Sequence, residues 1–184
     1  EALRAFGGLP VTLGELVEAA SCGSSVVKGL VKLGVVAEED APRDTPYPRL
    51  QAAKGMRLEG EQVAAGDALV AAVALGGYSA TLLKGVTGSG KTEVYLEAVA
   101  ECLRAGRQAL VLLPEIALTA EFLTRVEARF GARPAEWHSG VTITERRRLW
   151  KMGAGGEAGL VVGARSALFL PFQDLGLIVV DEEH

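Results

Sequence analysis

The 184-residue chain is long enough for one domain, or for one domain with a small module, and its 49% hydrophobic and 23% charged residues are typical of a globular protein. It has no apolar run of membrane-spanning length and no signal-peptide pattern, so we expect a soluble, cytoplasmic protein without a membrane partner. The net charge of −4 excludes a broadly basic surface, so any contact with nucleic acid has to be local.

Residues 1–45 are predicted to form a winged helix-turn-helix module. Apolar residues at helical spacing predict two short helices, followed by a strand. The expected elements are helices at 13–20 and 25–33, a turn with a helix N-cap at 21–24, and a strand at 35–38. Helix, tight turn, helix and strand occur in this order in winged helix-turn-helix domains.

The charge of this module leaves its role open. In DNA-binding members of this fold the second helix contacts DNA. Here that helix has only Lys28 and Lys32 as cations, and residues 1–44 hold four Lys and Arg against seven Asp and Glu. A structural module that packs between domains is therefore an equally good interpretation.

Residues 46–60 are predicted to be a linker. Three prolines among charged residues fall within 41–48, and 50–60 show no regular pattern. Residues 61–75 are rich in Ala and Val and are predicted to form a helix.

A phosphate-binding loop is predicted at residues 85–92. They read Gly-Val-Thr-Gly-Ser-Gly-Lys-Thr and match the pattern G-x-x-x-x-G-K-[ST]. Its glycines allow backbone N–H groups to approach phosphate oxygens. Lys91 supplies a positive charge for the phosphates, and Thr92 supplies a hydroxyl ligand for Mg²⁺. A buried strand at 81–83 and a helix at 93–103 are expected around it, with Gly106 at the end of the helix.

Beyond this loop, strands and helices are predicted to alternate. The strands are expected at 109–113, 135–138, 160–162 and 177–180, and the helices at 118–130 and from Thr142, which has capping-box spacing to Glu145, to Lys151. This alternation is typical of an α/β fold with a parallel sheet and helices on both faces. The polar segments that follow the strands would then share one edge of the sheet.

Acidic residues end the last predicted strand. The run 177–180 is continuously apolar, which predicts a central parallel strand. Asp181 and Glu182 follow it, and together with the phosphate loop they predict a Mg²⁺ partner and a residue that orients the attacking water.

Three other features carry predictions of their own. Arg146, Arg147 and Arg148 with Lys151 form the clearest basic cluster, and we interpret them as a solvated helix face, with a DNA contact as the alternative. Cys22 and Cys102 are too far apart in sequence to form a disulfide framework or a metal set. The chain begins at Glu1 without Met and ends on a motif, so we expect a fragment of a longer protein.

Several strings resemble the PriA family of primosomal replication-restart DNA helicases, in helicase superfamily 2. They lie at 83–96 (LKGVTGSGKTEVYL), 113–119 (LPEIALT), 138–140 (HSG), 165–169 (RSALF) and 181–184 (DEEH). The resemblance covers 58–184 strongly and the earlier part loosely, and it implies that 61–184 form a first RecA-like motor lobe, truncated at its C-terminus.

The resemblance also implies roles for individual residues. Lys91, Asp181 and Glu182 would be catalytic, with Thr92 and Asp181 on Mg²⁺. ATP would be bound by Gln62, which would read adenine, and by Gly85, Thr87, Gly88, Ser89, Gly90, Lys91 and Thr92. DNA would be contacted by Pro114, Glu115, Thr119, Arg165 and Ser166. His138 receives no chemical role, and Trp137 is interpreted as a core residue rather than a base-stacking platform.

Two departures from the family concern the DNA contacts. Ala164 stands where Thr is usual, which removes a hydroxyl, and Ala120-Glu121 stands where Pro-Gln is common.

The cofactors implied are ATP and Mg²⁺, and the partners are forked or single-stranded DNA, primosome proteins and single-stranded DNA-binding protein. In this family a second motor lobe supplies an arginine finger. The family's zinc-binding cysteines would lie beyond His184, so no zinc site is expected in this chain. We therefore expect the chain to bind nucleotide with little or no turnover.

Two alternatives to a 3′→5′ helicase that restarts stalled forks remain at this stage. One is another superfamily 2 DNA translocase. The other is a nucleotide-switched regulator with a winged-helix DNA-binding module, which would bind nucleotide without hydrolysing it.

Overall fold

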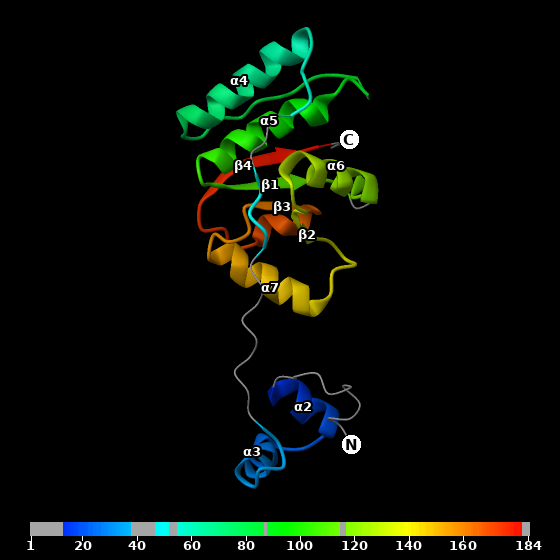
Figure 1. The fold of residues 1–184 in the computed structure, drawn as a ribbon, viewed down its shortest axis with the longest axis vertical. Coiled ribbons are helices and arrows are strands. Elements are labelled where there is room, and N and C mark those ends of the chain that lie inside the picture. Colours follow the sequence, from blue (N-terminus) through cyan, green and yellow to red (C-terminus); the bar gives the residue numbers. More distant parts are fainter. Residues whose placement is uncertain (1–12, 38–46, 52–54, 87, 115–116, 182–184) are drawn as a thin grey trace. The chain divides into compact units, whose positions relative to one another are not determined.

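The computed structural model of the chain describes residues 13–37, 47–51, 55–86, 88–114 and 117–181 (Figure 1). By its internal contacts the chain divides into two compact units, 1–44 and 45–184. Among the described residues, no helix is long and apolar enough to cross a membrane.

The first unit contains the two predicted helices. Helix α2 spans Leu13–Ala20 and helix α3 spans Ser24–Lys32, and they pack together with Leu16 and Val27 buried. Gly23 is the N-cap of α3 and makes no side-chain cap.

The strand predicted at 35–38 is not formed in its described part. The backbone N–H groups of Val35 and Val36 donate to the carbonyl oxygen of Leu30, at 3.0 and 3.4 Å. These bonds fold the segment back onto the end of α3, so its N–H groups are not available for strand pairing. The winged helix therefore remains a prediction, with its two helices confirmed.

The second unit is built on a parallel sheet of four strands. They are β1 (Gln108–Leu112), β2 (Ala135–Trp137), β3 (Leu160–Gly163) and β4 (Leu175–Val180). Their order in the sheet is β2-β3-β1-β4, and every neighbouring pair is parallel. Strands β1 and β3 are buried at every position because helices cover both of their faces.

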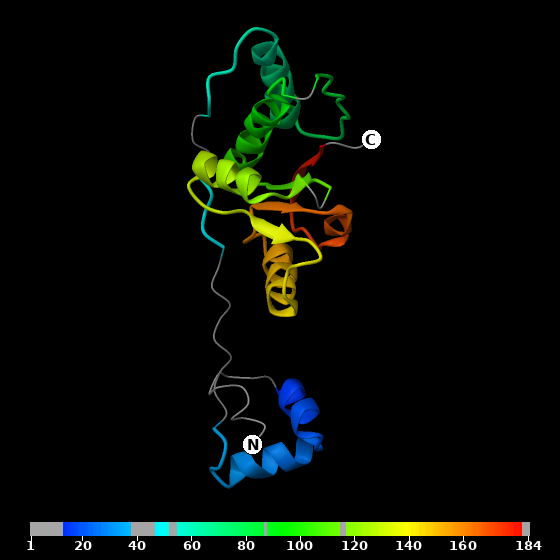
Figure 2. The ribbon, with the colours of Figure 1, turned by 90° about the vertical axis from the view of Figure 1, so that its right-hand side faces the viewer.

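Helices cover both faces of this sheet, as predicted (Figures 1 and 2). They are α4 (Glu61–Leu75), α5 (Lys91–Arg104), α6 (Ala120–Phe130) and α7 (Ile143–Ala154), with the short helix η2 at Arg165–Phe169. One core cluster joins α5 and α6 to the sheet and includes Leu96, Val99 and Phe130. The opposite cluster joins α7 and η2 to the sheet through Leu149 and Ala167.

The helix ends follow the predicted signals. The Thr119 and Thr142 hydroxyls accept from the backbone N–H groups of Phe122 and Glu145, each at 3.2 Å, and cap α6 and α7. Gly106 follows α5 with a φ of +74°, a conformation that glycine adopts without steric cost.

Two predictions about strands are wrong. No strand forms at 81–83, where Leu82 is 78% exposed. Strand β4 lies at the edge of the sheet rather than in its centre, and Ile178 and Val180 are 46% and 53% exposed. An apolar run indicates that a strand forms, but its neighbours are decided by pairing with distant segments.

The described part of 46–60 packs on the second unit. Leu50 contacts the core cluster of α5 and α6, and the N–H of Gln51 donates to the carbonyl oxygen of Phe130 at 2.7 Å. The Arg148 guanidinium lies 4.3 Å from the centroid of the Tyr47 ring. These residues are irregular but anchored, whereas the sequence predicted a linker; the domain boundaries themselves remain a prediction.

Cys102 is expected to resist thiol reagents in the folded protein. Its side chain is fully buried on α5, and burial raises the pKa of the thiol from 9.0 to about 11. At pH 8 a chromogenic disulfide reagent should therefore modify only Cys22 rapidly, and Cys102 only after unfolding in urea. Cys22→Ser is the matched control and should remove the rapid phase; a rapid phase that persists would contradict the burial of Cys102.

The same shift has a consequence for stability. Between pH 9 and 11 the folded state retains a proton on Cys102 that the unfolded chain loses. The contribution of this thiol to stability is therefore complete below pH 9 and declines as the pH rises toward 11.

Candidate nucleotide-binding site

The predicted phosphate loop leads directly into α5. Gly88 and Gly90 have φ values of +81° and +80°, a region that L side chains rarely adopt. A Cβ atom on Gly85 would lie 2.6 Å from the Ser89 Oγ, so the loop is also too tight for a side chain there. Gly90 is the N-cap of α5 and makes no side-chain cap, which leaves the first N–H groups of the helix for an anion.

Lys91 lies over this loop. Its Nζ donates to the carbonyl oxygens of Gly85 and Val86, at 2.8 and 3.0 Å. The ammonium therefore lies within the phosphate loop, which leads into the positive N-terminal end of the α5 dipole. This arrangement suits a polyphosphate.

Gln62 comes to the loop from α4, which packs along α5. Its Nε2 donates to the carbonyl oxygen of Ser89 at 2.9 Å, and its Oε1 accepts from the N–H of Glu59 at 3.2 Å. A Cβ on Gly90 would lie 2.6 Å from Nε2, so the Gln62 side chain would have to move, and the φ of +80° also favours glycine at this position. The structure thus brings Gln62 to the phosphate loop, while its role in reading adenine remains a prediction.

Asp181 and Thr92 meet around Tyr95. The N–H of Asp181 donates to the carbonyl oxygen of Leu112 at 3.0 Å, which places Asp181 at the carboxyl ends of β1 and β4. Tyr95 follows Thr92 by one helical turn on α5, and α5 packs against both strands. Burial raises the pKa of Tyr95 far above its usual value, the nearby Asp181 carboxylate raises it further, and the Thr92 hydroxyl lowers it. The predicted Mg²⁺ ligands are therefore neighbours.

This corner fits a magnesium ion bound together with a nucleotide. The Tyr95 hydroxyl is buried yet makes no hydrogen bond of good geometry to the described residues, although Thr92 and Asp181 lie close by. No group of three His, Cys, Asp or Glu side chains that could hold a metal occurs among the described residues. Magnesium needs only one or two protein ligands, because phosphate and water oxygens complete its coordination.

Three of the residues predicted to contact DNA lie along the same edge of the sheet, in segments that the structure describes. Pro114 follows β1, and Arg165 and Ser166 follow β3, so parallel strands bring them to the edge that holds Asp181. The Thr119 hydroxyl is already used as the cap of α6, and Ser166 Oγ accepts from the Trp137 indole N–H at 3.1 Å. The predicted residues Thr87, Glu115 and Glu182 lie outside the described residues.

Comparison with known proteins decides the family. The family model for the DEAD/DEAH box helicases matches residues 65–184. The chain belongs to the DEAD/DEAH box helicase family.

This helicase chain is also similar to curated proteins named replication restart protein PriA. It is 39% identical to the protein of Bacillus subtilis (strain 168) over 181 residues, which cover 96% of this chain and 22% of that protein. It is 41% identical to the protein of Synechocystis over 174 residues, which cover 94% of this chain and 21% of that protein. The helicase chain thus spans about a fifth of the length of these relatives.

Replacing Tyr95 with Phe in this chain should leave its stability unchanged, or raise it by up to about 1 kcal/mol. The reason is that the change removes a buried hydroxyl without a hydrogen-bond partner among the described residues and retains the packed ring. Urea unfolding measures the difference. Tyr78→Phe is the control, since Tyr78 is 97% exposed. A loss of more than about 1 kcal/mol in Tyr95→Phe would show that the hydroxyl is hydrogen-bonded in the folded chain.

Sequence reasoning missed Tyr95 and the contacts of the basic cluster. Arg146 is not simply solvated, because its Nη2 donates to the carbonyl oxygen of His138 at 3.0 Å and its guanidinium lies 5.5 Å from the Trp137 ring centroid. Arg148 pairs with Glu145 at 3.2 Å. Glu145 and Arg148 are three residues apart on α7, a spacing that could have suggested their ion pair. The contacts of Arg146 with His138 and Trp137 could not be found in this way, because those residues belong to β2 and the segment after it.

Proposed function

We propose that this helicase chain is the nucleotide-binding part of the first RecA-like motor lobe of an ATP-dependent 3′→5′ DNA helicase. In this proposal the whole protein recognises stalled replication forks and restarts replication by primosome assembly. The observation that carries the ATP-dependent part is the glycine loop that holds the Lys91 ammonium at the start of α5, with Asp181 fixed at the carboxyl ends of β1 and β4. The similarity to replication restart proteins supports the cellular role.

In this proposal, different residues bind the phosphates, the adenine, the magnesium ion and the attacking water. The N–H groups at the start of α5 and the Lys91 ammonium hold the phosphates, and Gln62 reads adenine from α4. Thr92 and Asp181 hold Mg²⁺, which neutralises charge on the phosphate oxygens when bound. Glu182 then orients the attacking water and accepts its proton.

DNA lies along the carboxyl edge of the sheet in this proposal. Pro114, Glu115 and Thr119 contact its backbone from the segment after β1, and Arg165 and Ser166 contact it from the segment after β3. Since these segments share an edge with Asp181, a change at the nucleotide is transmitted over a short path to the DNA. Primosome proteins and single-stranded DNA-binding protein are the proposed partners.

Hydrolysis needs more than this chain provides. Charge that develops on the transferred phosphate is stabilised by an arginine from a second motor lobe. We therefore propose that the 184 residues bind Mg²⁺-nucleotide with little or no turnover.

The test compares ATP hydrolysis by this chain and by the longer protein, each with and without forked DNA. The proposal expects little or no turnover from the chain, and DNA-stimulated turnover with 3′→5′ strand separation from the longer protein. Strong DNA-stimulated turnover by the chain would contradict the division between lobes. Nucleotide binding without turnover in the longer protein would favour a regulator over a helicase.

A further inference from the structure

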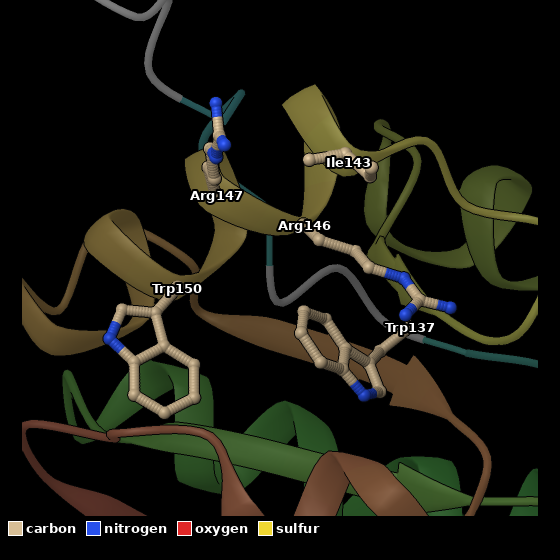
Figure 3. A pocket seen from close by; sticks show the side chains of 5 residues that line it. All are labelled: Trp137, Ile143, Arg146, Arg147 and Trp150. Atoms are coloured by element: carbon tan, nitrogen blue, oxygen red, sulfur yellow. The ribbon is translucent and has the colours of Figure 1, made fainter. Parts of the chain in front are cut away.

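A pocket of about 280 Å³ lies beside α7, away from the nucleotide-binding corner (Figure 3). We call it the tryptophan pocket. It is lined by Trp137, Ile143, Arg146, Arg147 and Trp150. Trp137 comes from β2, and the other four lining residues come from α7. Strand β2 lies at the opposite end of the sheet from β4 and Asp181, so the pocket is distinct from the nucleotide site.

The α7 residues of the pocket lie on one face of the helix. Positions 143, 146, 147 and 150 follow the i, i+3, i+4, i+7 spacing of a single stripe. Leu149 and Met152 occupy the buried side and pack into the core. The stripe nevertheless exposes 70% of Ile143 and 51% of Trp150, which is a large apolar surface to leave beside two arginines.

The Trp137 side of the pocket is fixed in place. Its indole N–H donates to Ser166 Oγ at 3.1 Å, and the Arg146 guanidinium lies over its ring, as Figure 3 shows. Arg146 is itself held by the carbonyl oxygens of His138 and Ser139, at 3.0 and 3.3 Å. A Cβ on Gly163 would lie 2.4 Å from the Trp137 carbonyl oxygen, so glycine is required for the close approach of β3 to β2.

The charge around the tryptophan pocket is positive, in a chain whose net charge is −4. Helix α7 has four cations, at 146, 147, 148 and 151, and a single acid, Glu145, which pairs with Arg148. In Figure 3 the Arg147 side chain points away from the two indoles. Flat aromatic rings beside guanidinium groups match nucleic-acid bases joined by phosphates, since bases stack on aromatic faces and phosphates pair with arginine.

We propose that the tryptophan pocket binds a base of a single DNA strand, stacked on the Trp150 indole, with Arg147 on an adjoining phosphate. This inference rests on the proposed function, because it deepens the contact with DNA. It adds base stacking to the backbone contacts proposed for Arg165 and Ser166, and the Trp137–Ser166 hydrogen bond connects the two. It retains Trp137 as a residue packed against the core and favours the DNA contact, the alternative interpretation of the basic cluster on α7.

Tryptophan fluorescence can report binding at this pocket directly, since the two tryptophans of the chain both line it. Single-stranded oligothymidylate is titrated into the 184-residue chain while tryptophan fluorescence is recorded. Stacking of a base on Trp150 should quench the emission. An abasic strand of the same length has the same phosphate charge and no bases, and it should bind more weakly without quenching. Equal binding of both strands without quenching would overturn the proposal.

Substitutions locate the effect. Trp150→Leu retains an apolar side chain and should weaken oligothymidylate binding at least about fivefold. Arg147→Ala should reduce the slope of log affinity against log salt concentration by about one, the loss of one phosphate contact. Arg125→Ala removes a half-exposed arginine from α6 and is the control for charge alone. If Trp150→Leu and Arg125→Ala bind alike, the tryptophan pocket is not the binding site.

A last pair of measurements separates this inference from the proposed function. Mg²⁺-ADP binding by Trp150→Leu should equal that of the unchanged chain, because the pocket and Lys91 lie apart. If nucleotide binding is retained but DNA never quenches the fluorescence, only the inference fails. The proposal is likewise overturned if DNA has no effect on the tryptophan fluorescence and Trp150→Leu abolishes self-association of the chain in sedimentation. The exposed stripe would then be a contact between protein molecules.

Discussion

Lys91→Ala is expected to weaken Mg²⁺-ADP binding about 100-fold, because a charge-assisted hydrogen bond to phosphate contributes roughly 1.5–3 kcal/mol and about 1.4 kcal/mol corresponds to tenfold in affinity. The Lys91 Nζ lies within the phosphate loop, on the carbonyl oxygens of Gly85 and Val86, and the loop leads into the N-terminus of α5. Titration with a fluorescent ADP analogue measures the change. The melting temperature should hardly move, since the Lys91 hydrogen bonds lie at an exposed position.

Lys84→Ala is the matched control for this change. Lys84 is an exposed lysine just before the phosphate loop. Its replacement removes the same charge and leaves the loop itself unchanged. It should alter the affinity by less than about threefold, in line with the small effect of an exposed charge. Equal losses in the two variants would indicate general electrostatic attraction and would contradict the proposed role of Lys91.

Gln108→Leu is expected to lower the free energy of unfolding by about 3–5 kcal/mol, since each buried polar group left unpaired costs roughly 1–3 kcal/mol. Gln108 is 2% exposed on β1. Its Nε2 donates to the carbonyl oxygens of Gly153 and Ala158, at 3.1 and 2.9 Å. Its Oε1 accepts from the N–H groups of Gln173 and Asp174, at 2.8 and 3.0 Å. One side chain therefore joins the end of α7 to the approach to β4.

Urea unfolding followed by circular dichroism measures this loss. Gln51→Leu, at an exposed position, is the control and should change the free energy of unfolding by less than about 0.5 kcal/mol. If Gln108→Leu were as stable as the control, the four hydrogen bonds would contribute nothing net, and the account of how α7 is anchored would be wrong.

Local signals explain why most elements of the second unit were predictable. Thr142 with Glu145 marked the start of α7, and Gly106 marked the end of α5, because caps are set by residues within one turn. The position of β4 at the edge of the sheet was not predictable in this way. Its residues are as apolar as those of β1, and only pairing with distant segments distinguishes the two strands.

The nucleotide corner was predictable in part for the same reason. The phosphate loop is a contiguous pattern whose glycines have local steric roles, and the structure places Lys91 and Thr92 with it. The neighbourhood of Thr92, Tyr95 and Asp181 depends on α5 packing across β4, over a separation of more than eighty residues. No local pattern indicates that a buried tyrosine hydroxyl lies between the two.

The same limit explains the tryptophan pocket. Positions 143, 146, 147 and 150 share a helix face that the sequence shows, but Trp137 reaches them only through the packing of β2 beside α7. Sequence patterns identified Trp137 as a core residue, and it does pack against the core cluster of α7 and η2. They did not indicate that Trp137 also lines a pocket with the exposed stripe of α7.

Calorimetric titration of the unchanged 184-residue chain with ADP, in the presence and absence of Mg²⁺, tests whether the nucleotide site is preformed. We expect saturable one-to-one binding that is stronger with Mg²⁺, because Thr92 lies at the start of α5 and Asp181 at the carboxyl ends of β1 and β4 before any ligand binds. No heat of binding in either buffer, from a chain whose folded state is confirmed by circular dichroism, would contradict a preformed nucleotide site.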